Sequence, residues 1–216
     1  LSELSFEVPR SKMLVVQHGS YVGYYPDTVG RSSAREIFGF SESDFVVAFT
    51  GQIRRYKGVE KLVRAFGAMD DSSRLLIAGK ANYNFSELLE KVLPVQARGR
   101  VFFRDRFVSD NALQLIYKAA DVAVFPYERV LTSGSALLAM SFGCSPILPD
   151  FAMGRELLKS GQYGYLYDPT HPDGLRRAMA ESRAAKESGA LGSRRAAVME
   201  ASKQLDWQPF SALFEF

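Results

Sequence analysis

The chain has 216 residues, enough for one large domain or two small ones with a buried core. With 47% hydrophobic and 24% charged residues it has the composition of a globular protein, and its net charge of +3 is too small to indicate a nucleic-acid partner. A single cysteine excludes an intrachain disulfide, and with only two histidines we expect no metal site.

Short apolar runs alternate with helical patterns along the chain. Six runs are predicted to be strands, at residues 45–50, 74–78, 101–103, 122–125, 146–149 and 164–167. Helices are predicted between and after them, at residues 59–69, 88–93, 109–120, 136–142, 154–160, 170–179, 193–203 and 207–216. This alternation predicts an α/β fold, a doubly wound Rossmann-like parallel sheet with helices on both faces.

We expect a cytoplasmic protein without a membrane span. No run approaches the roughly 18 apolar residues of a transmembrane helix, and residues 1–10 lack the apolar centre of a signal peptide. Between residues 176 and 203 the chain has seven basic residues and three glutamates. A solvated helix surface explains this segment most simply, and contact with the inner face of an anionic membrane is the alternative.

The loop at residues 51–58 joins the first predicted strand to a helix. In an open parallel sheet, ligands bind beyond the carboxyl ends of the strands, where this loop lies. Gly51 lets a ligand approach the backbone, and Arg54, Arg55 and Lys57 place three cations beside a helix N-terminus, which itself attracts anions. This pattern predicts a phosphate or diphosphate clamp, and a solvated basic turn is the competing interpretation.

The loop that ends at residue 135 follows another predicted strand and precedes a helix. Thr132, Ser133 and Ser135 can cap that helix, and Gly134 leaves the backbone open, so the first N–H groups point toward a bound phosphate. Glu128 is the nearest carboxylate, and it can accept hydrogen bonds from sugar hydroxyls or pair with the arginine that follows it. An ordinary helix cap is the alternative interpretation.

Three isolated residues carry weaker signals. Glu156 is predicted to lie at the start of a short helix, where the helix dipole alone explains an acidic side chain. His18, which precedes a glycine, is expected to be a turn residue, and Cys144 a small buried residue.

From residue 12 to about residue 180, the order of these motifs resembles the C-terminal, donor-binding domain of retaining, group 1 glycosyltransferases with the GT-B fold. Residues 51–58 resemble the G-R-x-x-x-x-K-G loop of that family, and residues 119–126 resemble its A-D-V-x-V-x-P-S strand. The other similar stretches are residues 75–79, 101–108, 139–148 and 154–164. The resemblance implies one half of a GT-B architecture.

The resemblance also implies a substrate and a set of site residues. The donor is a nucleotide-diphosphate sugar, no further cofactor is expected, and Glu128 is the candidate catalytic residue. The candidate donor-binding residues are Gly51, Gln52, Arg54, Lys57, Arg106, Thr132, Ser133, Gly134 and Ser135.

This chain departs from the family pattern at three positions. Lys57 matches the lysine of the diphosphate clamp, but Gln52 stands where the family has arginine, and Arg54 is the candidate replacement. The two positions where the family carries glutamate are Val130 and Leu138 here. Glu128 can replace the first glutamate only if the loop is shifted by two residues.

The resemblance suggests three segments. Residues 1–25 correspond to an interdomain linker and first strand, residues 26–204 to the nucleotide-sugar-binding domain, and residues 205–216 to a C-terminal helix that packs on an N-terminal acceptor domain. The sequence lacks that acceptor domain, so we expect the chain alone to bind a donor without transferring its sugar.

Two other functions stay open from the sequence. The apolar residues at the family's acidic positions favour a non-catalytic module that binds a nucleotide or an anionic glycan. A nucleotide-sugar epimerase with a similar fold is the third hypothesis. A dinucleotide-dependent dehydrogenase is disfavoured because no G-x-G-x-x-G motif follows a predicted strand.

Overall fold

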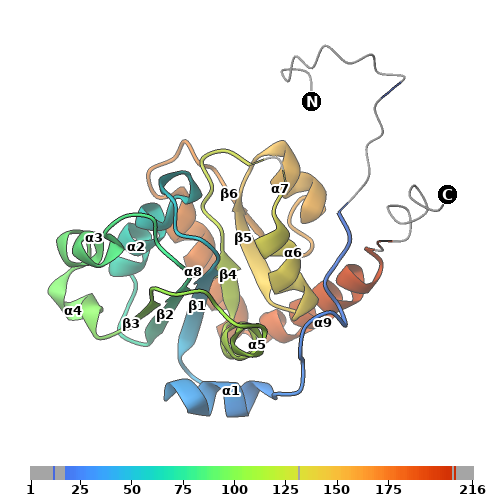
Figure 1. The fold of residues 1–216 in the computed structure, drawn as a ribbon, viewed down its shortest axis with the longest axis horizontal. Helices are drawn as coiled ribbons and strands as arrows, with labels where there is room; N and C mark the ends of the chain where they lie inside the picture. Colours follow the sequence, from blue (N-terminus) through green and yellow to red (C-terminus); the bar gives the residue numbers. More distant parts are fainter. Residues whose placement is uncertain (1–11, 13–17, 131, 206, 208–216) are drawn as a thin grey trace.

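The computed structural model describes residues 12, 18–130, 132–205 and 207. Its six strands form one parallel sheet in the order β3-β2-β1-β4-β5-β6 (Figure 1). The strands are β1 (Phe45–Thr50), β2 (Ser73–Ala78), β3 (Val101–Arg104), β4 (Val122–Val124), β5 (Ser145–Pro149) and β6 (Tyr165–Tyr167). The order reverses between β1 and β4, as in the doubly wound sheet that the sequence predicts.

Helices cover both faces of this sheet, which confirms the predicted fold class. On one face α2 packs against α3 and α8, while on the other α1 packs against α5 and α6 packs against α9. Figure 1 shows α5 and α6 in front of the sheet and α8 behind it. The helices are α1 (Arg31–Phe38), the 3-10 helix η2 (Arg55–Lys57), α2 (Val59–Gly67), α3 (Phe85–Val92), α4 (Val95–Arg98), α5 (Asp110–Ala119), α6 (Gly134–Ser141), α7 (Ala152–Leu157), α8 (Gly174–Glu187) and α9 (Ala190–Lys203).

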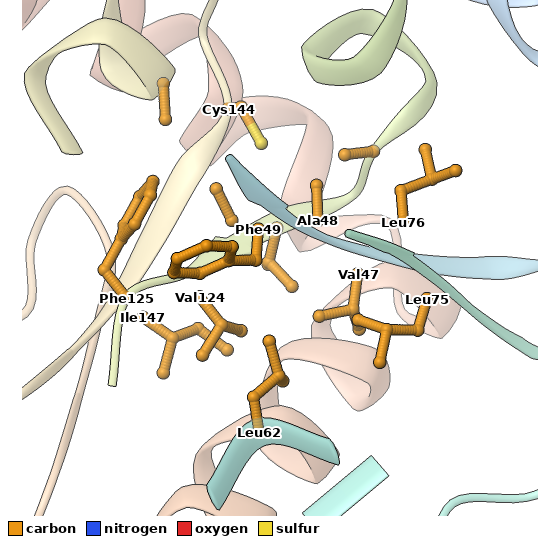
Figure 2. Close-up of a cluster of buried hydrophobic side chains, with 14 of the residues drawn as sticks. Val47, Ala48, Phe49, Leu62, Leu75, Leu76, Val124, Phe125, Cys144 and Ile147 are labelled. Atoms are coloured by element: carbon orange, nitrogen blue, oxygen red, sulfur yellow. The ribbon is translucent and has the colours of Figure 1, made fainter. Parts of the chain in front are cut away.

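Strand β1 lies at the centre of the core, and all six of its residues are buried. Its side chains alternate between the two faces of the sheet. Figure 2 shows Val47 and Phe49 on the side that Leu62 of α2 covers, and Ala48 on the side of Cys144. Apolar contacts on both faces explain why this strand reads as a continuous hydrophobic run.

The structure corrects several expected boundaries. Helix α7 begins at Ala152, so Glu156 lies near its end and not at its start. Helix α8 begins after Asp173, because Asp168 accepts hydrogen bonds from the backbone and the hydroxyl of Thr170 and holds that segment in a turn. Ser109 is the N-cap of α5 as expected, but its side chain accepts no capping hydrogen bond.

The ends of the chain match the expectation only in part. The described residues 18–25 form turns and coil and contain no strand. Of the helix expected at residues 207–216, only Trp207 is described, so that prediction lies outside the described residues. Helices α1 and α4 were not predicted.

Most basic side chains of α8 and α9 bond to the rest of the domain. Arg194 donates to the carbonyls of Gly161 and Gly164, Arg195 donates to a carbonyl at the end of α5, and Arg183 pairs with Asp70. These hydrogen bonds and ion pairs occupy many of the basic side chains whose charge favours contact with a membrane. None of the described helices is long and apolar enough to cross a bilayer.

Asp121 anchors the amino-terminal edge of the sheet. This carboxylate is 1% exposed and lies 2.6 Å from the Arg31 guanidinium, 2.8 Å from that of Arg35 and 3.1 Å from the Lys186 ammonium. It also accepts the N–H of Val46, at 2.7 Å. Burial lowers the pKa of Arg35 and of Lys186, and the negative charge of Asp121 opposes both shifts. One carboxylate therefore joins α1 and α8 to the two central strands.

The substitution Asp121→Asn is expected to reduce the free energy of unfolding by about 3–5 kcal/mol, because it leaves buried cations without a counter-charge. Urea denaturation measures this loss. Asp71→Asn is the matched control, since the Asp71 side chain is 97% exposed and lies 3.7 Å from its cationic neighbour. Similar losses in the two variants would contradict this account of the buried network.

Candidate functional site

The candidate site lies where the loops that follow β1 and β4 meet, at the carboxyl-terminal edge of the sheet. The Glu128 N–H donates to the Tyr56 carbonyl at 3.0 Å, which joins the second loop to η2. Gly58 has a φ of 65°, and a Cβ atom there would overlap the Pro126 carbonyl oxygen. Glycine is therefore required for this close approach.

The hydrogen bonds that join β1, β2 and β3 continue into the loops that follow these strands. The Ile53 N–H donates to the Lys80 carbonyl at 2.9 Å, and the Gly79 N–H donates to the Arg104 carbonyl at 3.1 Å. Asp105 accepts the N–H of Ala81 at 2.9 Å, and this hydrogen bond lowers the pKa of its carboxyl. The edge on which a ligand would rest is therefore fixed by backbone hydrogen bonds.

Lys57 is a half-buried cation at this junction. Its Nζ lies 4.6 Å from the centroid of the Tyr127 ring and donates a long hydrogen bond of 3.4 Å to the Tyr127 hydroxyl. Burial lowers the pKa of Lys57, and the nearby charge of Arg54 lowers it further. Within the described part of the chain, no carboxylate forms an ion pair with this lysine. An anionic ligand would supply the missing counter-charge.

The N-terminus of α6 faces the same junction. Ser133 caps this helix, because its Oγ accepts the Ala136 N–H at 3.1 Å and donates to the Tyr127 hydroxyl at 3.1 Å. Gly134 and Ser135 form the first turn, whose N–H groups have no acceptor within the helix. These N–H dipoles and the Lys57 ammonium form a concentration of positive charge.

The buried side chain of Tyr117 links the end of β1 to the first turn of α6. The Tyr117 hydroxyl of α5 bonds to the Thr50 hydroxyl at the end of β1, and it donates to the Ser135 carbonyl at 3.4 Å. Burial raises the pKa of Tyr117 and that of Tyr127. Both hydroxyls therefore stay protonated at neutral pH, and the proton of Tyr117 serves the hydrogen bonds that join α5 to β1 and to α6.

The structure brings together about half of the residues that the sequence singles out. A Cβ on Gly51 would lie 3.2 Å from the Ser135 hydroxyl, which shows how closely the two predicted loops approach. The residues at the junction are Gly51, Lys57, Ser133, Gly134 and Ser135. Gln52, Arg54 and Thr132 are exposed.

Three other charged residues point elsewhere. The Glu128 side chain is 48% exposed and pairs with Lys61 at 3.2 Å, not with the arginine that follows it. The Arg55 guanidinium lies over the Tyr83 ring, 5.1 Å from its centroid. Arg106 is exposed beyond β3, at the rim of an apolar groove of about 590 Å³ that also includes Phe107.

A second pocket lies outside the junction. It has a volume of about 440 Å³ and lies between α2 and the start of α8, and its basic lining residues include Arg64, His171 and Arg176. None of the predicted site residues lines it. No group of three potential metal ligands among His, Cys, Asp and Glu occurs in the described ranges.

Sequence reasoning missed the tyrosines of the site. Tyr127 carries a detectable signal, since it directly follows a predicted strand. Tyr117 lies within the helix predicted at residues 109–120, and nothing local indicates that its hydroxyl reaches β1. Tyr21 was not singled out, and its hydroxyl lies beside Gly134.

Comparison with known proteins identifies the family and the fold. Residues 44–182 match the family described as "Glycosyl transferases group 1". An uncharacterized glycosyltransferase of Methanocaldococcus jannaschii is 25% identical over 175 residues, which are 79% of this chain and 44% of that protein. The chain thus spans less than half of this relative.

Two solved structures show the same fold. The C-terminal domain of a group 1 glycosyl transferase (LpcC) from Francisella tularensis superposes with a TM-score of 0.67 at 18% identity, over 87% of this chain and 95% of that one. Anabaena HepE, solved with UDP and glucose, superposes with a TM-score of 0.70 at 17% identity, over 86% of this chain and 52% of that one. The chain has the Rossmann-like fold of one GT-B domain and belongs to the group 1 glycosyltransferases.

Proposed function

We propose that this domain binds a nucleotide-diphosphate sugar, with the diphosphate at the junction of the loops after β1 and β4, for transfer of the sugar to a glycan, a lipid or another acceptor. The observation that carries the proposal is the environment of Lys57. This half-buried cation and Ser133, which caps α6, both bond to the Tyr127 hydroxyl, and among the described residues Lys57 has no carboxylate partner. A diphosphate supplies the negative charge that this arrangement favours.

The same groups suit the chemistry of glycosyl transfer. As the bond between the anomeric carbon and the phosphate oxygen breaks, negative charge grows on the leaving nucleoside diphosphate. The Lys57 ammonium, held by Tyr127, and the N–H groups of Gly134 and Ser135, held in the first turn of α6, are proposed to stabilise that charge from fixed positions. Arg54 is exposed in the same loop as Gln52 and is the candidate for the second cation of the clamp.

Glu128 is proposed to orient the donor sugar. In the unliganded chain its carboxylate pairs with Lys61 on the surface. An exposed ion pair of this kind contributes only about 0–1 kcal/mol, so Glu128 can exchange Lys61 for a sugar hydroxyl at little cost. Arg106, beyond β3, is proposed to lie at the nucleobase end of the donor.

A non-catalytic binding module is the second candidate function. It is favoured by Val130 and Leu138, which pack against the hydrophobic core at positions where the family resemblance implies glutamates. Membership of the glycosyltransferase family leaves the epimerase hypothesis without support. Sugar transfer by the whole protein would exclude the module.

We also propose that the whole protein carries an acceptor domain. The chain spans 44% of its archaeal relative and 52% of HepE, so both proteins have room for a second domain. Residues 1–25 and 205–216 are proposed to lead to that domain. A cytoplasmic location, with or without peripheral contact to a membrane, remains part of this proposal.

Calorimetric titration with UDP, GDP and ADP is expected to show binding of one of them. Lys57→Ala should weaken that binding about tenfold or more, because it removes a cation from a charge-assisted contact. Lys91→Ala is the matched control, since Lys91 is exposed on α3 and pairs with Glu87. Unchanged affinity in Lys57→Ala, or no binding of any diphosphate to the unmodified chain, would contradict the proposal.

The chain alone is expected to release no diphosphate from the matching nucleotide sugar, because the groups that hold an acceptor are proposed to lie on another domain. A coupled assay for free nucleoside diphosphate measures this, with and without candidate acceptors. Turnover by the 216-residue chain would show that it holds a complete active site.

A further inference from the structure

Tyr21 lies along helix α6, although it belongs to the segment before α1. Its backbone N–H donates to the Ser141 hydroxyl at 2.9 Å, at the last residue of α6. At the other end, a Cβ atom on Gly134 would lie 3.2 Å from the Tyr21 hydroxyl. Tyr21 therefore extends along α6 from its last residue to its first turn. Its hydroxyl lies at that first turn, where we propose that the diphosphate binds.

Neighbouring aromatic rings hold Tyr21 in this place. His18 packs edge to face against the Tyr21 ring, and the centroids of the two rings lie 5.5 Å apart. The centroid of the Trp207 ring lies 6.3 Å from that of Tyr21. The Trp207 indole donates to the Ser20 carbonyl at 2.7 Å, and the Ser20 N–H donates to the Leu205 carbonyl at 2.9 Å. His18 and Trp207, which lie near opposite ends of the described chain, therefore fix the Tyr21 side chain.

The Tyr21 hydroxyl is available as a hydrogen-bond donor. Burial raises its pKa, and the nearby Tyr25 raises it further, so the hydroxyl keeps its proton at neutral pH. Among the described residues, this hydroxyl forms a hydrogen bond only with His18 Nε2, and at 3.4 Å that bond is long. The other ring nitrogen of His18, Nδ1, donates to the Gly19 carbonyl at 2.7 Å. A phosphate oxygen beside Gly134 would offer Tyr21 a stronger, charged acceptor.

The strand order indicates which phosphate this would be. From β3, beyond which Arg106 is proposed to lie at the nucleobase end of the donor, the edge of the sheet runs through β2 and β1 to β4. Helix α6 follows β4, so Tyr21 lies at the opposite end of the site from Arg106. We infer that the Tyr21 hydroxyl is a further donor-binding group, which donates to the phosphate nearest the sugar. This inference rests on the proposed function of the site.

The test compares a nucleoside diphosphate with its monophosphate, using the member of the UDP, GDP and ADP set that the unmodified chain binds. Tyr21→Phe removes only the hydroxyl and is expected to weaken diphosphate binding about tenfold or more, as for other lost hydrogen bonds to a charged group. Its affinity for the monophosphate should stay nearly unchanged. His18→Ala, which removes a ring that supports Tyr21, should cause a smaller loss of the same kind.

Tyr24→Phe is the matched control, because Tyr24 is an exposed tyrosine of the same segment with no atom within 4 Å of the Cβ position on Gly134. Thermal unfolding verifies that each variant is folded. Unchanged diphosphate affinity in Tyr21→Phe, or an equal loss for both nucleotides, would overturn the inference and leave the proposed function intact. Failure of the unmodified chain to bind any nucleotide would overturn the proposed function and this inference with it.

Discussion

The close approach of the loops after β1 and β4 determines the candidate site. Gly58 lies against the Pro126 carbonyl, where any side chain would overlap it, and the Glu128 N–H bonds to the Tyr56 carbonyl. These backbone contacts hold η2 in place and set Lys57 over the Tyr127 ring. The position of the cation thus depends on a contact that only glycine permits.

The two edges of the sheet differ in how their buried and half-buried cations are neutralised. At the amino edge, Asp121 neutralises buried cations and joins α1 and α8 to the central strands. At the carboxyl edge, Lys57 and the first turn of α6 carry positive charge for which the described residues provide no carboxylate partner. Cations are thus neutralised within the domain at the amino edge, whereas at the carboxyl edge the proposed diphosphate would supply the counter-charge of Lys57.

The sequence predicts the six strands and the fold class, because apolar runs such as that of β1 report burial on both faces directly. It also predicts that the loops containing Gly51, Lys57 and Ser133 converge, since strand ends meet at one edge. Side-chain orientation is harder to predict, because it depends on residues that are distant in the chain. Arg55 turns to Tyr83, and Tyr21 reaches α6, through contacts that no local pattern indicates.

The proposed function requires that a nucleoside diphosphate bind at the junction of the loops after β1 and β4. An amide chemical-shift titration of the isotope-labelled chain with the diphosphate that it binds tests this most directly. The largest shifts are expected at Gly51, Gly134 and Ser135, and little change is expected at residues 170–173, which line the separate pocket beside α8. Shifts confined to residues 170–173, or shifts that are absent from the first turn of α6, would contradict it.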